Sequence, residues 1–345
     1  MDQNTPFKKR RPRYPGTHPR TFEQKYKELN SEKYALDVKK IIERGQTPAG
    51  THRPICVREI LSLLDPKPGQ TGLDATLGYG GHTQELVKNV LPGGKLFAID
   101  ADPLTISQTE SRLRKLGYTE DVLVIRRMNF AGILKLLPVA GGFDFVLADL
   151  GVSSMQLDTP SRGFSFKLDT PLDLRMNPKH GQPAAELIKS LTKNELAELF
   201  INNSDEPYAD ILAHAVFTGR QTINTGKNLA DVIRSTLKSR NVSPDDTKKS
   251  VQRVFQALRI SVNDEFGALE QFLKLLPQCL NPGARVAILT FHSGEDRRVK
   301  KSFQSNFRNG IFTDIARSPL RPSPEEKRSN PRSACAKLRW AIYLG

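Results

Sequence analysis

A glycine-rich turn with an acidic residue before it offers the most definite chemistry in the sequence. Gly78, Gly80 and Gly81 follow a short strand-like run that ends at Asp74. Glycines let the backbone approach a ligand closely, and N–H groups at a helix start suit a carboxylate or a phosphate. The spacing alone also fits a dinucleotide. Asp74 favours S-adenosylmethionine, because a carboxylate there can hold an ammonium group that NAD lacks, and because in NAD sites the glycines follow the strand immediately.

Two further residues at strand ends fit the same ligand. Asp100 ends a second strand-like run, where a carboxylate can hydrogen-bond both ribose hydroxyls, as it also does in NAD folds. Asp102 precedes Pro103 and is therefore expected to cap a helix instead. Phe130 follows the third strand-like run and is placed to pack on an adenine ring, although an isolated aromatic residue is more often part of the core.

Acidic, hydroxyl and imidazole groups follow two later strand-like runs. Asp149 ends a buried-strand pattern with Ser153 close behind it, and His292 ends another such pattern. Methyl transfer to an exocyclic amine needs an acceptor for the N–H, which Asp149 or a neighbouring hydroxyl could supply. A structural role for His292 is an equally good interpretation. We predict Asp149, Ser153 and His292 as catalytic residues.

Bringing these residues together requires a parallel sheet. Strand and helix patterns alternate after residue 52, which is typical of βαβ units with both faces covered. The expected strands are 71–74, 95–100, 122–126, 143–150, 285–292 and 336–343, and the expected helices before the insertion are 57–64, 83–90 and 103–116. No strand pattern is evident between about 160 and 265, where the helical runs are 184–188, 194–200, 208–220, 227–239 and 247–262.

The pattern as a whole predicts an α/β protein of three parts. Residues 51–160 and 266–345 are expected to form a class I (Rossmann-like) S-adenosylmethionine-dependent methyltransferase core. Residues 161–265 are expected to form a helical insertion, and residues 1–50 a basic, partly disordered extension with one helix in 21–44.

The charge balance favours a polyanionic partner. Lys and Arg outnumber Asp and Glu by 52 to 37 over 345 residues, which gives a net charge of +15. Nucleic acid is the first candidate, and a basic surface kept for solubility is the alternative. Arg297, Arg298, Lys300 and Lys301 form a basic cluster at a helix start that either holds RNA phosphates or is a solvated charged face.

Cysteine usage and hydropathy indicate which structural sites and which cellular location to expect. The three cysteines are far apart and form no C-x-x-C pair, which argues against a disulfide framework and against a structural zinc site. We expect no metal. The sequence has no apolar run of about 18 residues and its N-terminal residues lack a signal-peptide pattern, so we expect no membrane span and a cytoplasmic location.

Together these segments resemble the MraW/RsmH family of bacterial 16S rRNA cytosine-N4 methyltransferases over most of residues 52–343. The matching stretches are His52-Arg53-Pro54-Ile55, residues 74–83, 98–103 and 149–154, Gln156-Leu157-Asp158, Arg162-Gly163-Phe164-Ser165-Phe166, residues 171–176 and 255–260, Phe291-His292-Ser293 and Asn330-Pro331-Arg332. The resemblance implies N4 methylation of a decoding-centre cytosine in the assembled small ribosomal subunit, with the helical insertion helping to hold the rRNA. It implies S-adenosylmethionine contacts at Gly80, Gly81, His82, Asp100, Phe130, Asp149 and Gln156.

Two segments depart from the family pattern and keep alternatives open. Gly294 stands where the family commonly has Leu, and residues 203–206 stand where a Tyr-Gly-Glu-Glu-like stretch is typical. A paralogue that methylates another RNA site is one alternative. A non-catalytic ribosome-assembly or RNA-binding factor is another, although the intact Asp74, Asp100 and Asp149 count against it. The oligomeric state is open, with a homodimer as one option.

Overall fold

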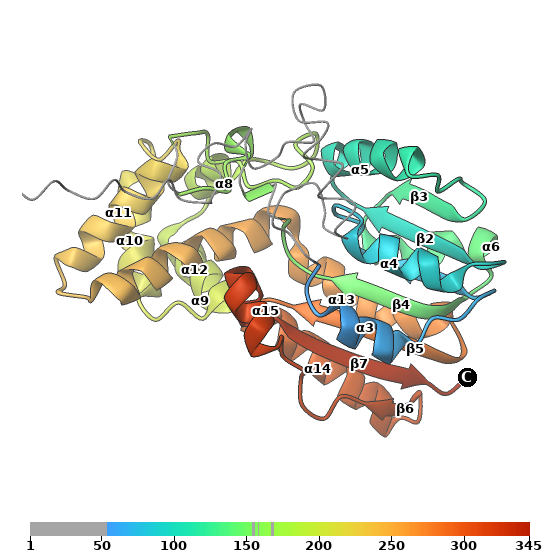
Figure 1. The fold of residues 1–345 in the computed structure, drawn as a ribbon. Helices are drawn as coiled ribbons and strands as arrows, with labels where there is room; N and C mark the ends of the chain where they lie inside the picture. The colour runs from blue at the N-terminus through green and yellow to red at the C-terminus, as the bar shows by residue number, and fades with distance from the viewer. Residues whose placement is uncertain (1–53, 154–155, 158, 167–168) are drawn as a thin grey trace, which may run out of the picture. The chain divides into compact units, whose positions relative to one another are not determined.

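The computed structural model describes residues 54–153, 156–157, 159–166 and 169–345, so the basic extension and the helix expected in 21–44 lie outside the described residues. Within them, one sheet has the strand order β3-β2-β1-β4-β5-β7-β6 (Figure 1). The strands are β1 Thr71–Asp74, β2 Lys95–Asp100, β3 Leu123–Arg127, β4 Phe143–Asp149, β5 Leu280–Thr290, β6 Phe312–Ile315 and β7 Lys337–Tyr343. Strands β1 to β5 pair in parallel, and β7 runs antiparallel between β5 and β6. This topology confirms the class I (Rossmann-like) methyltransferase fold.

Helices cover both faces of the sheet because alternate strand residues point to opposite sides. Leu96, Ala98 and Leu147 face one hydrophobic cluster. That cluster also takes residues from α3 Val57–Leu64, α4 Gly81–Val90 and α5 Pro103–Lys115. Phe97 and Val146 face the opposite cluster. Its other contributors are the 3-10 helices η2 Phe130–Leu136 and η4 Leu276–Cys279 and the helices α13 Glu265–Leu275 and α14 Ser293–Arg308.

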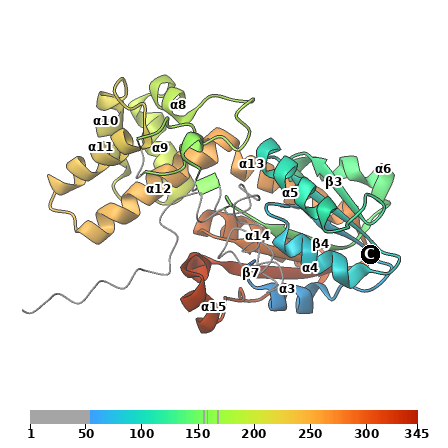
Figure 2. The same cartoon turned by 45° about the horizontal axis from the view of Figure 1, so that its top comes forward.

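The segment between β4 and β5 builds a third hydrophobic cluster from five helices and from loop residues such as Phe164, Leu172 and Ile223. Figure 2 shows these helices together. The helices are α8 Ala184–Ser190, α9 Lys193–Ser204, α10 Ala209–Gly219, α11 Gly226–Lys238 and α12 Pro244–Asn263. Thr192 and Thr225 start α9 and α11 with capping boxes, which satisfy N–H groups that a helix start leaves unpaired. In the described part of residues 160–265 the only β pairing is the isolated bridge between Pro171 and Thr225.

The predicted elements before β5 are present with ends shifted by a few residues, and the largest differences lie after α12. Strand β5 starts at Leu280, before the predicted start at 285, because residues 281–284 form an irregularity inside its pairing with β4. It ends at Thr290, two residues before His292, because His292 caps α14. Helix α13, strand β6 and helix α15 Pro324–Ser329 were not predicted. No helix among the described residues is long and apolar enough to cross a bilayer. The domain boundaries stay a prediction.

Candidate active site

The turn after β1 is held in shape by Asp74. This buried carboxylate accepts hydrogen bonds from the Thr83 hydroxyl at 2.6 Å and from the Thr76 N–H at 3.1 Å. Burial raises the pKa of Asp74, and the Thr83 hydroxyl opposes that shift. Both oxygens of Asp74 therefore bind the turn itself, so its first effect is to fix the backbone that follows β1.

The glycines of this turn are required by its backbone. Gly78 and Gly80 have positive φ angles of 47° and 66°, which only glycine adopts easily. A Cβ on Gly81 would lie 2.6 Å from Cγ of Pro54. Helix α4 begins at Gly81, two residues earlier than predicted, so the turn leads directly into a helix start. Backbone N–H groups and the positive end of the helix dipole therefore gather at Gly80 and Gly81.

Asp100 at the end of β2 is joined to the same turn. Its Oδ2 accepts the N–H of Gly78 and its Oδ1 accepts the N–H of Asp102, both at 2.9 Å. Burial raises the pKa of Asp100 to about 6, although these two N–H groups favour the ionised form. Phe130 is half-buried and its ring centroid lies 5.2 Å from that of Phe272, edge to face. Phe130 therefore packs on the core through Phe272, and its contact with adenine stays a prediction.

Asp149 at the end of β4 lies beside His82 of α4. His82 Nε2 is 3.5 Å from Asp149 Oδ2, and the Asp149 N–H donates to the Thr76 hydroxyl at 2.6 Å. Asp149 Oδ1 is buried and accepts no hydrogen bond from the described residues. A buried carboxylate oxygen without a partner is costly, and such oxygens are common where a ligand or a reacting group binds. No sequence pattern indicates the role of Thr76, whose contact with Asp149 joins the turn after β1 to the end of β4.

Ser153 and Gln156 bind each other and do not reach Asp149 by any hydrogen bond in the described residues. Gln156 Oε1 accepts the N–H of Ser153 at 2.8 Å, and the Ser153 hydroxyl accepts the N–H of Gln156 at 3.3 Å. Gln156 Nε2 donates to Asp102 Oδ2 at 2.7 Å. The amide of Gln156 is thus fixed by Asp102, which also caps α5 as predicted.

His292 caps α14 through atoms of Glu295. Its Nδ1 accepts the Glu295 N–H at 3.4 Å, and its Nε2 lies 3.1 Å from Glu295 Oε1. Burial opposes ionisation of Glu295, but His292 and the N–H of Phe291 outweigh it and hold the pKa of Glu295 below its usual value. No hydrogen bond or ion pair joins His292 to Asp149 in the described ranges. The structure thus places His292 beside Glu295, a residue that the sequence prediction missed.

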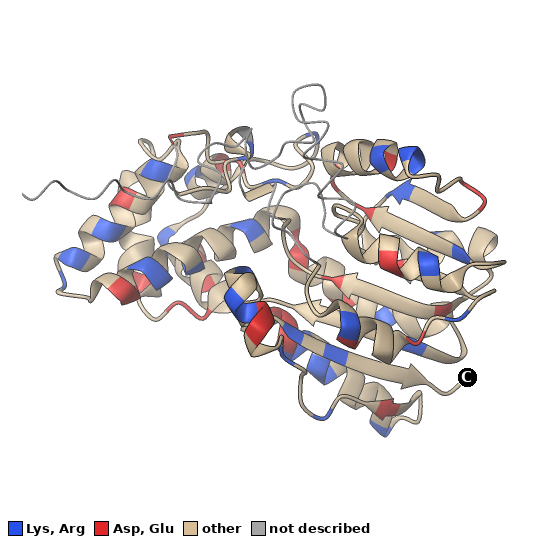
Figure 3. Cartoon of the chain, viewed as in Figure 1, with Lys and Arg blue, Asp and Glu red and all other residues tan. Residues whose placement is uncertain are grey.

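Two of the four residues in the predicted basic cluster on α14 pair with carboxylates of the protein. Arg297 makes two hydrogen bonds of 3.0 Å to Asp205, and Arg298 binds Glu270 at 2.7 Å. The Arg298 guanidinium also lies 3.5 Å from the ring centroid of Phe266. Lys300 and Lys301 remain exposed. In the described chain, basic and acidic residues are interleaved over α8–α12 and over the helices around the sheet (Figure 3). Arg297 and Arg298 therefore pair with carboxylates in the protein alone, and phosphate binding by the four residues stays a prediction.

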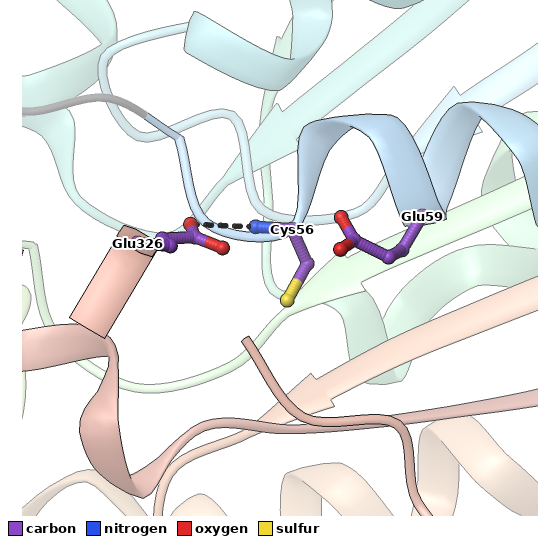
Figure 4. A group of neighbouring side chains, drawn as sticks. All are labelled: Cys56, Glu59 and Glu326. Carbon is purple, nitrogen blue, oxygen red and sulfur yellow. Dashed lines mark hydrogen bonds between the residues drawn. The ribbon is translucent and has the colours of Figure 1, made fainter. Parts of the chain in front are cut away.

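A second group of acidic and sulfur side chains lies beside the start of α3. Sγ of Cys56 and a carboxylate oxygen of each of Glu59 and Glu326 lie within 4.8 Å of one another (Figure 4). Glu326 accepts the N–H of Cys56 at 2.9 Å, which ties α3 to α15. Burial and the two carboxylates raise the pKa of Cys56 to about 12, so its thiol keeps its proton near neutral pH. Cys56 is therefore no candidate nucleophile.

Comparisons with known proteins show the family to which the chain belongs. A family model described as the MraW methylase family matches residues 49–343. The chain is 51% identical to ribosomal RNA small subunit methyltransferase H 1 of Lachnoclostridium phytofermentans, over 99% of this chain and 94% of that protein. It is 52% identical to ribosomal RNA small subunit methyltransferase H 2 of Alkaliphilus metalliredigens, over 99% of both chains. With Agathobacter rectalis ribosomal RNA small subunit methyltransferase H 1 the identity is 48% over 97% of both. The chain therefore belongs to the MraW methylase family.

Proposed function

We propose that this protein transfers the methyl group of S-adenosylmethionine to N4 of a decoding-centre cytosine in 16S rRNA within the small ribosomal subunit. Family membership over nearly the whole chain supports the reaction, and relatives named as small-subunit rRNA methyltransferases support the substrate. The net charge of +15 suits a partner rich in phosphates. The cytoplasm, where small subunits are found, is the proposed location, and the helices between β4 and β5 are the proposed RNA-recognition region.

The residues at the ends of β1 and β2 fit S-adenosylmethionine. The helix start at Gly80, Gly81 and His82 can receive its carboxylate, because N–H groups converge there. Asp100 can accept hydrogen bonds from both ribose hydroxyls, and Phe130 is the proposed adenine contact. When bound, S-adenosylmethionine supplies an electrophilic methyl group.

The observation that carries the proposal is the unpartnered Oδ1 of Asp149. The exocyclic amine of cytosine is a weak nucleophile, and an acceptor for its N–H both orients the nitrogen and removes the proton as the new bond forms. Asp149 Oδ1 is buried at the end of β4 with no other hydrogen bond from the described residues, and Oδ2 lies 3.5 Å from His82. We assign the proton-accepting role to Asp149, and His82 helps to hold its carboxylate.

Ser153 and His292 have a role in this proposal that differs from that of Asp149. The nitrogens of His292 both face Glu295, and the Ser153 hydroxyl accepts the N–H of Gln156. Both side chains therefore start local turns or helices, so we assign them to positioning. Their direct catalytic role stays a prediction from the sequence, and turnover measurements on variants decide it.

The direct test is to map the methylated nucleotide after purified full-length protein is incubated with small subunits and labelled S-adenosylmethionine. We expect label on N4 of one decoding-centre cytosine. Label at another RNA position would support a paralogue with a different target, and the Gly294 departure is the place to seek the cause. Absence of S-adenosylmethionine binding in calorimetry would contradict the enzyme assignment and favour a non-catalytic RNA-binding factor.

A further inference from the structure

Asp102 is a fully buried carboxylate with four hydrogen bonds, and only half of them serve its own helix. Its Oδ1 accepts the N–H groups of Leu104 and Thr105 at 3.0 and 3.4 Å, which caps α5. Its Oδ2 accepts Gln156 Nε2 at 2.7 Å and Arg162 Nη1 at 2.9 Å. These two donors come from the chain after β4, 54 and 60 residues away. A capping role alone does not account for them.

Arg162 extends the connection into the segment that leads to the helices. Its guanidinium is buried, and its second terminal nitrogen donates to the carbonyl oxygens of Arg175 at 3.0 Å and Met176 at 2.7 Å. The Leu174 N–H donates to the Arg162 carbonyl at 3.3 Å. Arg162 therefore holds residues 174–176 in place through its side chain and its carbonyl, and its charge is balanced by Asp102. A buried arginine that loses its acid becomes an uncompensated charge, so this pairing is strongly preferred over its separation.

The same residue is also joined to the proposed ribose site. The Asp102 N–H donates to Asp100 Oδ1 at 2.9 Å, and Asp100 Oδ2 accepts the Gly78 N–H. A ligand that fixes the Asp100 carboxylate therefore fixes the backbone position of Asp102. From Gly78 to Met176 the contacts run without interruption through Asp100, Asp102 and Arg162.

We propose that Asp102 is a positioning residue that couples S-adenosylmethionine binding at Asp100 to the order of the segment held by Arg162. This inference rests on the proposed function, because it takes Asp100 as the ribose contact. Coupling between two sites is reciprocal, so small subunits that order this segment also raise the affinity for S-adenosylmethionine. Gln156 shares the acceptor Oδ2, so its amide takes its productive position in the same step.

Asp102→Asn tests the coupling with little change in shape. The Asn oxygen can still cap α5, but its NH₂ group meets the donors of Gln156 and Arg162 without a lone pair to offer. Asp296→Asn is a matched control, because Asp296 is also a buried carboxylate and binds Arg339 at 2.6 Å and Lys337 at 2.9 Å, away from Asp102. Arg162→Lys is a second variant for the case in which Asp102→Asn does not fold. Lysine keeps the charge but cannot reach Asp102 and both carbonyls at once.

The experiment is amide hydrogen exchange on full-length protein with and without S-adenosylmethionine, with its affinity measured by calorimetry on the same samples. In the wild type we expect bound S-adenosylmethionine to slow exchange at Arg162 and Leu174 by about fivefold or more, the lower end of usual coupling. Asp102→Asn and Arg162→Lys should still bind it but lose the slowing, and Asp296→Asn should keep it.

Two results overturn the coupling and leave the proposed function intact. One is wild-type binding without slower exchange at Arg162 and Leu174. The other is equal loss of the slowing in Asp102→Asn and in Asp296→Asn, which shows general loosening of the core. Wild-type protein that does not bind S-adenosylmethionine overturns the coupling and the proposed function together. Small subunits should raise S-adenosylmethionine affinity in the wild type and in Asp296→Asn more than in Asp102→Asn, and equal increases in all three count against the coupling.

Discussion

The carboxyl ends of β2 and β5 both carry a helix cap and an Asp–Arg pair that reaches the segment between β4 and β5. After β2, Asp102 caps α5 and pairs with Arg162, and the two side chains are 0% and 8% exposed. After β5, His292 caps α14 and Arg297 pairs with Asp205, with both members of that pair 50% exposed. The residue types are the same, but water competes for the second pair and hardly for the first. We therefore expect the buried Asp102–Arg162 pair to affect stability and cofactor binding more than the exposed Asp205–Arg297 pair.

The largest expected difference is chemical and lies between the ends of β4 and β5. Asp149→Ala should lower the rate of methyl transfer by about 10²–10⁴-fold, because the amine loses its proton acceptor, and should change S-adenosylmethionine affinity much less. His292→Gln should have a far smaller effect, since a side-chain oxygen can still accept the Glu295 N–H. Single-turnover transfer to small subunits measures both. Equal rate losses would break the comparison and support the sequence prediction that His292 is catalytic.

The next largest expected difference is in the free energy of unfolding, between the buried pair after β2 and the exposed pair after β5. Arg162→Met leaves the Asp102 carboxylate buried without its cation, and we expect a loss of about 3–5 kcal/mol in the free energy of unfolding. Denaturant unfolding of the protein without S-adenosylmethionine is the measurement. A loss under about 1 kcal/mol, the level of an exposed pair, would contradict the weight that we give to burial.

Gly294 tests whether the end of β5 is closely packed despite its exposed ion pair. A Cβ at this position would lie 2.5 Å from Cζ of Phe266, and the Arg298 guanidinium covers the same ring. Gly294→Leu, which installs the residue that the family resemblance predicts at this position, should therefore cost about 1–3 kcal/mol through overpacking. Thermal unfolding measures the cost, and the double variant with Phe266→Ala should recover part of it. An unchanged single variant would show that Phe266 moves aside freely.

The affinity for S-adenosylmethionine should depend on pH through Asp100 at the end of β2. Ribose hydroxyls donate to an ionised carboxylate, and the pKa of Asp100 is raised to about 6 in the free protein. Above that pH the carboxylate is already ionised and affinity for S-adenosylmethionine is full. Below it a proton must leave first, so affinity should fall by about tenfold per pH unit. Calorimetry from about pH 5 to about pH 8 measures this. Asp100→Asn should bind weakly at every pH, and a slope that persists in it would point to another group.

The strand ends on the proposed cofactor side were predictable because their signals are local. Asp74, Asp100 and Asp149 each end an apolar strand run, and parallel strands place such ends at one edge of the sheet. The Asp102 cap was predictable from Pro103. The partner of Asp102 was not, because Arg162 lies 60 residues away and only the folded chain brings the two together. The same holds for Thr76 and Asp149, 73 residues apart.

Helix α13 and strand β6, which lie after α12, were missed for local reasons. Asp264 takes a left-handed conformation with φ 47° between α12 and α13, a break that is usually marked by glycine. The apolar pattern therefore runs on without a stop signal. Strand β6 has four residues and only its first and last are buried, so it shows no alternation. The charges of α14 look like a phosphate site in the sequence because Asp205 and Glu270, which pair with Arg297 and Arg298, lie 92 and 28 residues away.

The smallest expected effect concerns the exposed Arg297–Asp205 pair after β5. Arg297→Met removes two hydrogen bonds of 3.0 Å to Asp205, whereas Arg162 makes one hydrogen bond of 2.9 Å to Asp102. Solvent already binds half of each side chain, and holding two long exposed groups together costs side-chain entropy. We therefore expect a loss of about 0–1 kcal/mol in unfolding by denaturant, with methyl transfer to small subunits nearly unchanged. A loss as large as that of Arg162→Met would mean that the link from α14 to Asp205 is structural. A strong loss of transfer with unchanged stability would mean that Arg297 exchanges Asp205 for an RNA phosphate when the subunit binds.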